Sequence, residues 1–313
     1  MRLVQVLVVV MAVALWGSTG AWAVVDGKPA TGCALPTVVM VDGPVCSGVL
    51  VHRRVVATAR HCGNPHLIGF GDRLSGATVV RRVDHCEKPV GEGFGQDVQF
   101  CVLTDDAPDL PITPPLWGCE VNAALVRDAP VWMAGFGRTQ ASSVVGAGGK
   151  RMARGRVVEA LGGSIRVTSD EGNVCKGDSG GPLLVQLADE SWRVAGIFSS
   201  GDCAGDATYE ALQSHVRWFE KRTGMDLTPC HGDDGTWQPG ALCGGFFSGP
   251  PQVAGNWLRQ CEDAPRSNAS ATCGPPSPLV APATAGCSSA PPGSWVLGLL
   301  LVLRRRLRRQ HRN

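Results

Sequence analysis

The chain has 313 residues, enough for one two-lobed domain of about 200 residues and a smaller region beside it. Hydrophobic residues make up 44%, as in a globular protein, and the 41 glycines and 22 prolines favour a β-rich chain with many turns. The formal charge is +2, but without Arg2 and the six arginines at positions 304, 305, 306, 308, 309 and 312, 22 basic residues face 27 acidic ones. This mildly acidic body has no basic stripe, so nucleic acid is not an expected partner.

The N-terminus has the features of a secretory signal. Met1 and Arg2 precede an apolar run from Leu3 to Trp16, and small residues lead up to Ala23. We therefore expect residues 1–23 to be a signal peptide that is cut after Ala23, which would make Val24 the first residue of the mature chain. Thirteen cysteines agree with export, because disulfides persist in oxidising compartments.

Short β-branched runs bounded by turn residues follow Val24. They predict strands at residues 37–40, 48–51 and 54–57 in the first half and at 131–139 and 194–203 in the second. Leu212, Val216 and Phe219 recur at helical spacing and predict a helix over 211–224. Residues 140–149 are rich in Ser, Gly and Ala and predict a surface loop.

Three separated side chains could form a nucleophilic site. Ser179 lies in the string Gly177-Asp178-Ser179-Gly180-Gly181, where glycines let successive backbone N–H groups point toward one place. A serine hydroxyl is a weak nucleophile, so it needs a base and a group that orients the base. His61 and Asp97 lie upstream in that order. A metal ligand or a packed ring is the alternative for His61, and Asp84, Asp105 and Asp106 are other carboxylates near Asp97.

These segments resemble the chymotrypsin/trypsin family of serine peptidases. Residues 175–182 read CKGDSGGP, like the nucleophile loop of the family. Residues 58–62 read TARHC, like its TAAHC segment with Arg60 in place of an alanine, and residues 97–103 are similar to its DIALL strand. Residues 133–139 resemble its GWGRT strand, with Phe136 in the tryptophan position.

The resemblance implies an all-β fold of two packed six-stranded antiparallel barrels and a closing helix. The peptidase domain would span residues 24–228, with barrels at about 24–116 and 117–210. It also implies disulfides Cys46–Cys62 and Cys175–Cys203. Four cysteines of this region then allow three connectivities, of which we favour Cys86–Cys101 with Cys33–Cys119, although Cys101 could instead be a buried thiol.

The resemblance also assigns roles within the site. Ser179 would attack a peptide carbonyl, His61 would take its proton, and Asp97 would hold the imidazole with help from Ser199. The N–H groups of Gly177 and Ser179 would form the oxyanion hole. Asn173 stands where trypsin-like members carry an aspartate, which predicts poor cleavage after Arg or Lys and favours a small or medium, polar P1 residue. The remaining pocket residues would be Ser200 and Gly201, which pair with the substrate backbone, and Ala207, which narrows the pocket.

Activation would follow from the start at Val24. Residues 24–27 resemble the mature N-terminus of the family, whose α-ammonium pairs with the carboxylate beside the nucleophile, here Asp178. Because Ala23 precedes Val24, signal peptidase itself would free this terminus, and no zymogen segment is expected.

The family resemblance ends at Thr228. Residues 229–274 contain Cys230, Cys243, Cys261 and Cys273, which predict a small disulfide-rich module, and 275–292 form a linker rich in Pro, Ser and Ala. Residues 293–313 hold an apolar run of nine residues, too short for the roughly 20 that span a bilayer, and an arginine cluster. With Cys287 before it, this tail resembles the C-terminal sorting tails of exported myxobacterial proteins; a plain membrane stop held by arginines is the alternative.

Together these features predict a secreted serine endopeptidase that is retained at the bacterial surface, with Cys287 as the attachment point. Its expected partners are protein or peptide substrates and the export and sorting machinery, and we expect a monomer without metal or cofactor. A catalytically inactive binding protein on the same fold and an esterase are the alternatives.

Overall fold

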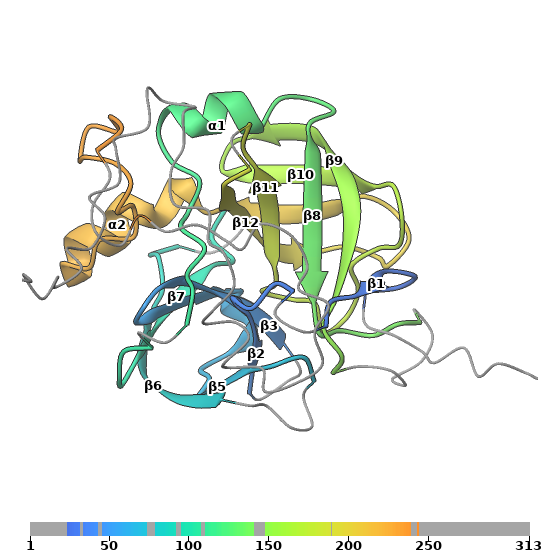
Figure 1. Ribbon diagram of the computed structural model, residues 1–313, viewed down its shortest axis with the longest axis horizontal. Coiled ribbons are helices and arrows are strands. Elements are labelled where there is room, and N and C mark those ends of the chain that lie inside the picture. Colours follow the sequence, from blue (N-terminus) through green and yellow to red (C-terminus); the bar gives the residue numbers. More distant parts are fainter. Residues whose placement is uncertain are drawn as a thin grey trace, which may run out of the picture. The chain divides into compact units, whose positions relative to one another are not determined.

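The first six-stranded barrel is formed by strands from the first third of the chain (Figure 1). The computed structural model describes residues 24–31, 34–42, 46–73, 79–91, 95–107, 110–140, 148–188, 190–238 and Cys243. Around the closed barrel the order is β2 (Val38–Val41), β3 (Cys46–His52), β4 (Val55–Thr58), β7 (Gln99–Leu103), β6 (Val79–Glu87) and β5 (Leu67–Phe70). All neighbours are antiparallel.

The second barrel closes in the same way. Its order is β8 (Pro130–Gly135), β9 (Arg151–Leu161), β10 (Ser164–Ser169), β13 (Ala207–Ala211), β12 (Trp192–Ser200) and β11 (Pro182–Gln186), and β11 pairs again with β8. Helix α1 (Cys119–Ala124) precedes it and α2 (Gln213–Thr223) follows it. The predicted architecture of two six-stranded antiparallel barrels with a closing helix is confirmed.

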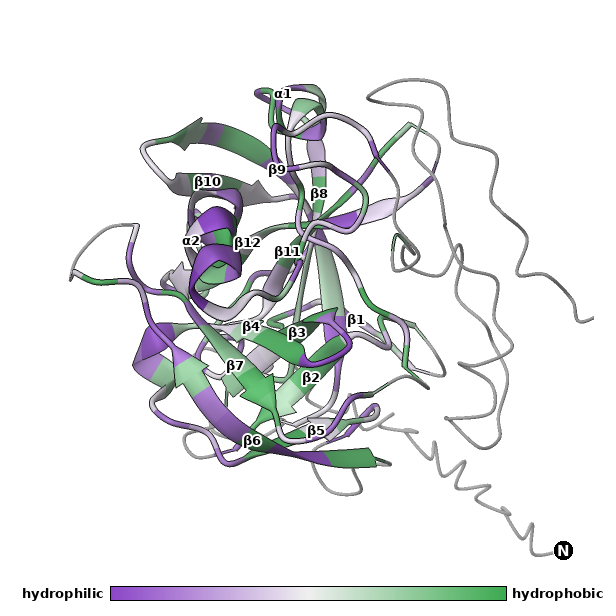
Figure 2. Ribbon diagram, turned by 90° about the vertical axis from the view of Figure 1, so that its left-hand side faces the viewer, coloured by the Kyte–Doolittle hydropathy of each residue, from purple (hydrophilic) through white to green (hydrophobic). Residues whose placement is uncertain are grey.

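The strands β2, β4 and β7 of the first barrel are buried along their whole length. The strands β2, β3 and β7 are largely hydrophobic, whereas α2 shows hydrophilic residues on its outer face (Figure 2). Phe100 of β7 packs against Phe219 of α2 with ring centroids 4.7 Å apart, so the helix closes over the first barrel. This contact uses the apolar stripe of α2 that its spacing indicated.

The predicted boundary of the first barrel needs a correction. The short strand β1 (Lys28–Pro29) pairs with β9, so it belongs to the second sheet although it precedes every strand of the first barrel. Val25 forms a further bridge with Asn173. The first barrel proper therefore begins at β2, because the residues after Val24 are bound to the second barrel by backbone hydrogen bonds.

The residues after Thr228 pack on the second barrel rather than apart from it. Arg193 of β12 and Glu120 of α1 form a buried ion pair of 3.0 Å, and the guanidinium of Arg193 lies 3.8 Å from the sulfur of Cys230. Arg217 of α2 covers the ring of Trp117, and Cys230 is bridged to Cys243. The described start of the predicted disulfide-rich module thus contacts β12 of the second barrel through Cys230.

Other predicted features lie outside the described residues. They are the signal peptide at 1–23, Cys33, most of the loop at 140–149, Cys261, Cys273, the linker at 275–292 and the tail at 293–313 with Cys287. Contacts divide the chain into the units Met1–Ser277 and Pro278–Asn313. Among the described helices, none combines the length and the apolar character needed to cross a lipid bilayer.

Candidate active site

His61 lies in a short 3₁₀ turn, Arg60–Cys62, that directly follows β4. The side chain of Gln99 fixes this turn, because its amide nitrogen donates to the carbonyls of Ala59 (3.0 Å) and Gly63 (2.9 Å) on either side. The predicted disulfide from Cys62 to Cys46 adds a covalent tie to β3. The backbone under the imidazole is thus held at three points, while the ring itself remains exposed.

Asp97, two residues before β7, binds His61 through both carboxylate oxygens. Oδ1 accepts the backbone N–H of His61 at 3.0 Å, and Oδ2 lies 2.7 Å from the ring atom Nδ1. The hydroxyl of Ser199 donates to the same Oδ2 at 2.7 Å, as predicted from the family pattern. Since an ionised carboxylate only accepts, Nδ1 carries a proton in this arrangement and Nε2 is left as the basic nitrogen.

The electrostatics of this pair suit a general base. The hydrogen bond that His61 donates to Asp97 raises the pKa of His61 above its ordinary value, against partial burial, which lowers it. Desolvation raises the pKa of Asp97, but the hydrogen bonds from His61 and Ser199 outweigh it, so that this pKa lies below its usual value. Asp97 therefore stays charged near neutral pH and favours the protonated form of the imidazole.

The loop with Ser179 is a tight backbone turn that only glycine can build at two places. Gly177 and Gly180 have φ values of 96° and 82°, in the region that favours glycine. A Cβ on Gly180 would lie 2.2 Å from the hydroxyl oxygen of Thr58, so the loop also packs against the residues before the His61 turn. Cys175 at its start is bridged to Cys203, as the family pattern implied.

Ser179 approaches the His61 turn through its backbone. Its carbonyl oxygen accepts the N–H of Ser47 at 2.8 Å and lies 3.7 Å from Sγ of Cys62, the residue after His61. Within the described residues the Ser179 hydroxyl and the imidazole form no hydrogen bond. The loops are therefore adjacent, with the nucleophile to base hydrogen bond not formed in this state; such bonds often tighten only when substrate binds.

Asp178 is completely buried beside the nucleophile. Its carboxylate accepts the N–H of Gly137 at 2.8 Å and of Cys175 at 2.9 Å. Burial raises its pKa to about 7, against these two hydrogen bonds, and no cation among the described residues pairs with it. Val24 is also fully buried, but here it is not a chain terminus, so the predicted α-ammonium is not present.

The predicted pocket residues differ in their burial and hydrogen bonds. Asn173 is 8% exposed, its N–H donates to the carbonyl of Val25 and its side-chain nitrogen donates to the carbonyl of Gly205 at 2.5 Å. Ala207 is buried, whereas Ser200 and Gly201 at the end of β12 are exposed. A Cβ on Gly201 would lie 3.3 Å from the ring of Phe198, so a larger residue here would crowd that ring.

The remaining cysteines and carboxylates also have definite places. Cys86 is bridged to Cys101, and Cys119 is disulfide-bonded, whereas its expected partner Cys33 lies outside the described residues. Asp84, one of the alternatives to Asp97, is exposed and binds the neighbouring His85 at 2.8 Å. Among the described residues no three His, Cys, Asp or Glu side chains are arranged to hold a metal.

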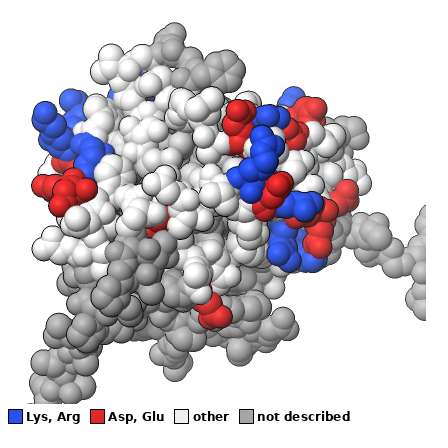
Figure 3. All heavy atoms as spheres, turned by 90° about the horizontal axis from the view of Figure 1, so that it is seen from above, with Lys and Arg blue, Asp and Glu red and all other residues white. Residues whose placement is uncertain are grey.

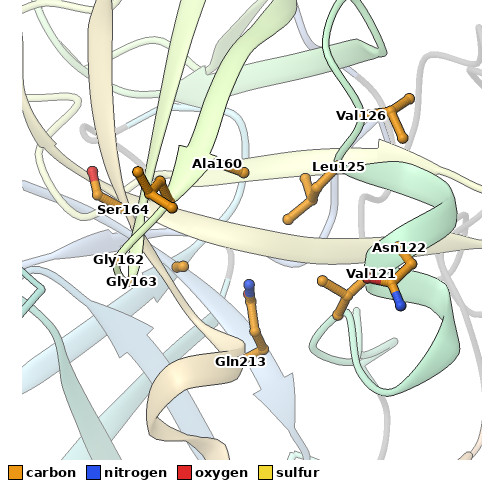
Figure 4. A pocket seen from close by; sticks show the side chains of 11 residues that line it. Val121, Asn122, Leu125, Val126, Ala160, Gly162, Gly163, Ser164 and Gln213 are labelled. Atoms are coloured by element: carbon orange, nitrogen blue, oxygen red, sulfur yellow. The ribbon is translucent and has the colours of Figure 1, made fainter.

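A separate groove of about 340 Å³ lies between α1 and the turn that joins β9 to β10 (Figure 4). Its lining includes Val121, Leu125 and Leu161, with Gln213 from the start of α2, and none of the predicted site residues. The groove is therefore not the place where His61 and Ser179 would act.

The surface view in Figure 3 shows lysines and arginines interspersed with acidic residues, without a continuous basic area on the face that it displays.

Comparison with known proteins gives the family. The sequence profile of the family described as Trypsin matches residues 24–218. The chain belongs to the trypsin family. The trypsin-family fold is also found in solved structures of human heparin binding protein: one has 17% sequence identity, a TM-score of 0.55, and coverage of 63% of this chain and 95% of the other.

Two further structures share the fold. An atomic resolution structure of the same heparin binding protein has 16% identity and a TM-score of 0.56 over 64% of this chain and 97% of the other. A mutant of the human protein has 18% identity and a TM-score of 0.55 over 64% and 96%. At these identities the likeness concerns the fold, and the chemistry of this trypsin-family chain must be argued from its own residues.

Sequence reasoning missed three polar residues of the site. Gln99 lies within the segment 97–103, Ser47 directly precedes the predicted strand 48–51, and both are completely buried. Glu210 of β13 is 2% exposed; burial, followed by the charge of Asp97, raises its pKa to about 7. A polar residue within a run of buried ones was the available signal, because such groups require specific partners.

Proposed function

We propose that this trypsin-family chain is a serine endopeptidase. The observation that carries the proposal is the hydrogen-bonded set of His61, Asp97 and Ser199, held beside a glycine turn that presents Ser179. A binding protein would have no need of a charged carboxylate that fixes one imidazole tautomer. The Asp97 carboxylate with three hydrogen bonds is the expected support for a base that becomes a cation during the reaction.

The proposed reaction is acyl transfer to water. The Ser179 oxygen attacks the carbonyl carbon of a peptide bond while its proton passes to Nε2 of His61. The imidazolium then gives this proton to the amine nitrogen as the C–N bond breaks and the amine leaves. A water molecule next attacks the acyl group, His61 accepts its proton and returns it to the Ser179 oxygen, and the carboxylic acid is released.

Oxyanion stabilisation would come from the N–H groups of Gly177 and Ser179. Neither N–H donates to a protein acceptor among the described residues, whereas the N–H groups of Asp178, Gly180 and Gly181 all do. Donors that are fixed in advance and free of internal partners are what a developing negative charge requires, and one such donor is typically worth about 10²–10³ in rate.

The substrate preference that we propose is a small or medium, uncharged polar P1 residue. Asn173 uses its amide nitrogen on the carbonyl of Gly205, which leaves its oxygen as the atom available to a substrate. A neutral oxygen can accept a hydrogen bond but cannot neutralise an Arg or Lys side chain. Profiling with a peptide library would test this, and a dominant preference for Arg or Lys at P1 would refute it.

Activation and location belong to the same proposal. Cleavage after Ala23 would give Val24 an α-ammonium, which could supply the counter-charge that buried Asp178 lacks in the uncleaved chain. The chain would be exported as a monomer and retained at the cell surface through Cys287. N-terminal sequencing of the exported protein tests the cleavage site, and a start other than Val24 would contradict the proposal.

A heparin-like ligand is a second possibility, raised by the names of the structural neighbours. Such a polyanion would be bound by clustered Lys and Arg, whereas the body of this chain has 22 basic and 27 acidic residues. We therefore do not favour it. An esterase would use the same groups, and parallel assays with peptide and ester substrates would separate the two activities.

The deciding experiment is hydrolysis of a protein substrate by the exported chain and by its Ser179→Ala variant. We expect the variant to lose at least about 10⁴-fold in rate, because the attacking oxygen is absent. Hydrolysis that persists in Ser179→Ala would show that the activity has another source. A folded native chain that hydrolyses neither peptides nor esters would favour the binding reading.

A further inference from the structure

Four successive backbone carbonyls of the nucleophile loop, from Lys176 to Ser179, accept hydrogen bonds. The N–H of Arg138 binds the carbonyl of Lys176 (2.9 Å), and the N–H of Gly181 binds that of Asp178 (2.7 Å). The hydroxyl of Ser47 binds the carbonyl of Gly177 (3.0 Å), and the N–H of Ser47 binds that of Ser179 (2.8 Å). Two of the four therefore depend on one residue, which lies about 130 positions earlier in the chain. The loop cannot turn its N–H groups elsewhere without breaking these bonds.

Ser47 belongs to β3 of the first barrel and is completely buried. Its hydroxyl donates to the Gly177 carbonyl and also accepts the N–H of Phe136 at 3.0 Å. Its own carbonyl accepts the hydroxyl of Thr58 at 2.7 Å, three residues before His61. Every polar group of Ser47 thus takes part in a hydrogen bond, and together these bonds join the histidine side of the site to the serine side.

The Ser47 hydroxyl binds the carbonyl of Gly177, a residue whose backbone torsions are weakly restricted. Gly177 has no Cβ and has a φ of 96°, so its own sterics restrict the backbone weakly. Arg138 fixes the carbonyl before Gly177 and Ser47 fixes the carbonyl after it, and together they determine both backbone torsions of this residue. Because each peptide unit is planar, the Gly177 N–H points opposite to the Lys176 carbonyl that Arg138 holds, and Ser47 fixes the peptide unit between Gly177 and Asp178 that separates it from the unit carrying the Ser179 N–H.

We propose that Ser47 is a positioning residue of the oxyanion hole, whose hydroxyl and N–H hold two loop carbonyls so that Gly177 and Ser179 present their N–H groups to the substrate oxygen. The inference rests on the proposed peptidase function. In this proposal Ser47, a residue of the first barrel, fixes in advance the positions of the Gly177 and Ser179 N–H groups, which belong to the second barrel.

A peptide aldehyde offers a readout that a purely structural role would not change. The Ser179 oxygen adds to the aldehyde carbon, the hydroxyl proton passes to His61, and the former carbonyl oxygen becomes the anionic oxygen that the two N–H groups bind. Affinity for such an adduct reports the oxyanion hole, whereas affinity for an unreactive peptide of the same sequence reports the binding cleft alone.

The test uses Ser47→Ala in the full chain purified after export. We expect kcat to fall by between about tenfold and a hundredfold, less than when an oxyanion donor itself is deleted, with KM nearly unchanged. Aldehyde affinity should fall by the same factor as kcat/KM, and the affinity for the unreactive peptide should not change. Ser47→Thr, which keeps a hydroxyl, should recover most of the rate.

Thr37→Val is the matched control. It removes another buried hydroxyl near the first barrel. This hydroxyl forms a hydrogen bond of 2.7 Å with the hydroxyl of Thr113 and, within the described part of the chain, none with the site residues. It should lower the melting temperature to a similar extent but leave kcat and aldehyde affinity near the native values. Native kcat and aldehyde affinity in Ser47→Ala, or equal losses in Thr37→Val, would overturn the proposal. Ser47→Gly provides a second variant without the hydroxyl.

A measurement without turnover separates this inference from the proposed function. In a Ser179→Ala background, NMR amide shifts of Gly177 and Asp178 should change when Ser47 is also replaced by Ala, because the loop loses its fixed torsions. Unchanged shifts would refute the positioning role even if the native chain is an active peptidase. An inactive native chain with changed shifts would instead refute the peptidase function alone.

Discussion

The histidine side and the serine side of the site are held by different kinds of interaction. On the histidine side a half-exposed imidazole is bound to a charged carboxylate, and their side chains are 45% and 22% exposed. On the serine side backbone carbonyls are held by buried neutral donors, and the adjacent carboxylate of Asp178 is fully buried. The histidine side permits proton transfer, whereas the hydrogen bonds of the serine side fix the backbone conformation of the Ser179 loop. We therefore expect changes on the histidine side to alter chemistry first and changes on the serine side to alter stability as well.

The largest effect on the histidine side should come from Asp97→Asn. The amide keeps the size of the side chain but removes the charge that favours the required imidazole tautomer, so kcat should fall by about 10⁴-fold. The melting temperature should change little by comparison, because the pair is partly exposed. Steady-state kinetics and calorimetry on the same preparation check both parts. A loss below tenfold would mean that Asp97 does not orient the base.

On the serine side the corresponding group is Asp178, and its signature is a pH dependence of stability. In a chain that retains residues before Val24, burial raises its pKa from 3.8 to about 7, so between about pH 4 and pH 7 the folded state binds a proton that the unfolded state does not. Stability should therefore decrease as pH rises through this window, by a few kcal/mol in total. Chemical denaturation at pH 5 and pH 8 measures it.

A chain that begins at Val24 should behave differently. Its α-ammonium would keep Asp178 ionised, and the pKa of the ammonium would itself be raised by the pair. The stability that the ion pair contributes is fully present below the ordinary α-amino pKa of about 8, and it is lost as pH rises through the raised pKa of the ammonium. Asp178→Asn should remove the acid-side slope in the uncleaved form. Identical pH profiles for both forms would contradict a link between Val24 and Asp178.

An intermediate effect is expected for Gln99→Leu. This variant removes the side-chain donor to the carbonyls of buried Ala59 and of Gly63, and it should cost about 1–3 kcal/mol of unfolding free energy. Because the His61 turn loosens, kcat should also decrease, by less than in Asp97→Asn. Urea denaturation and kinetics measure the two consequences. A variant as stable and as active as the native chain would show that Gln99 does not support the turn.

The smallest effect should follow Asp84→Asn. Asp84 and its partner His85 have side chains that are 57% and 47% exposed, so the pair contributes little to stability. We expect unfolding free energy within about 0.5 kcal/mol of the native value and an unchanged kcat. Since Asp84 was an alternative to Asp97 in the sequence, a large loss of activity here would reverse the assignment of the orienting carboxylate.

Local sequence signals were sufficient for α2, for the strings around His61, Asp97 and Ser179, and for those strands that are short β-branched runs, but β5, β6, β9, β10 and β13 were not predicted individually. They were not sufficient where a contact joins distant segments. Nothing near Lys28 indicates that β1 pairs with β9, more than a hundred residues later, and this pairing moved the N-terminal segment to the second barrel. Backbone pairing of a two-residue strand leaves no pattern in the sequence.

The buried polar residues were missed for a related reason. Ser47 and Gln99 are single polar letters within strands, and their importance comes from the carbonyls of Gly177, Ala59 and Gly63 that they bind. Which carbonyl a side chain meets is determined by the packing of the two barrels. Ser199, in contrast, could be predicted to bind Asp97 because the family pattern itself contains that contact.

The most direct test of the site is the rate of labelling by a fluorophosphonate as a function of pH, with the adduct located by peptide mapping. Labelling requires neutral His61 as base, and the Asp97 hydrogen bond raises the pKa of His61. We expect an adduct on Ser179 whose rate of formation rises with pH, with a midpoint above 6.5. A folded, exported protein that forms no adduct on Ser179, or one labelled at a rate independent of pH, would contradict a nucleophile activated by His61.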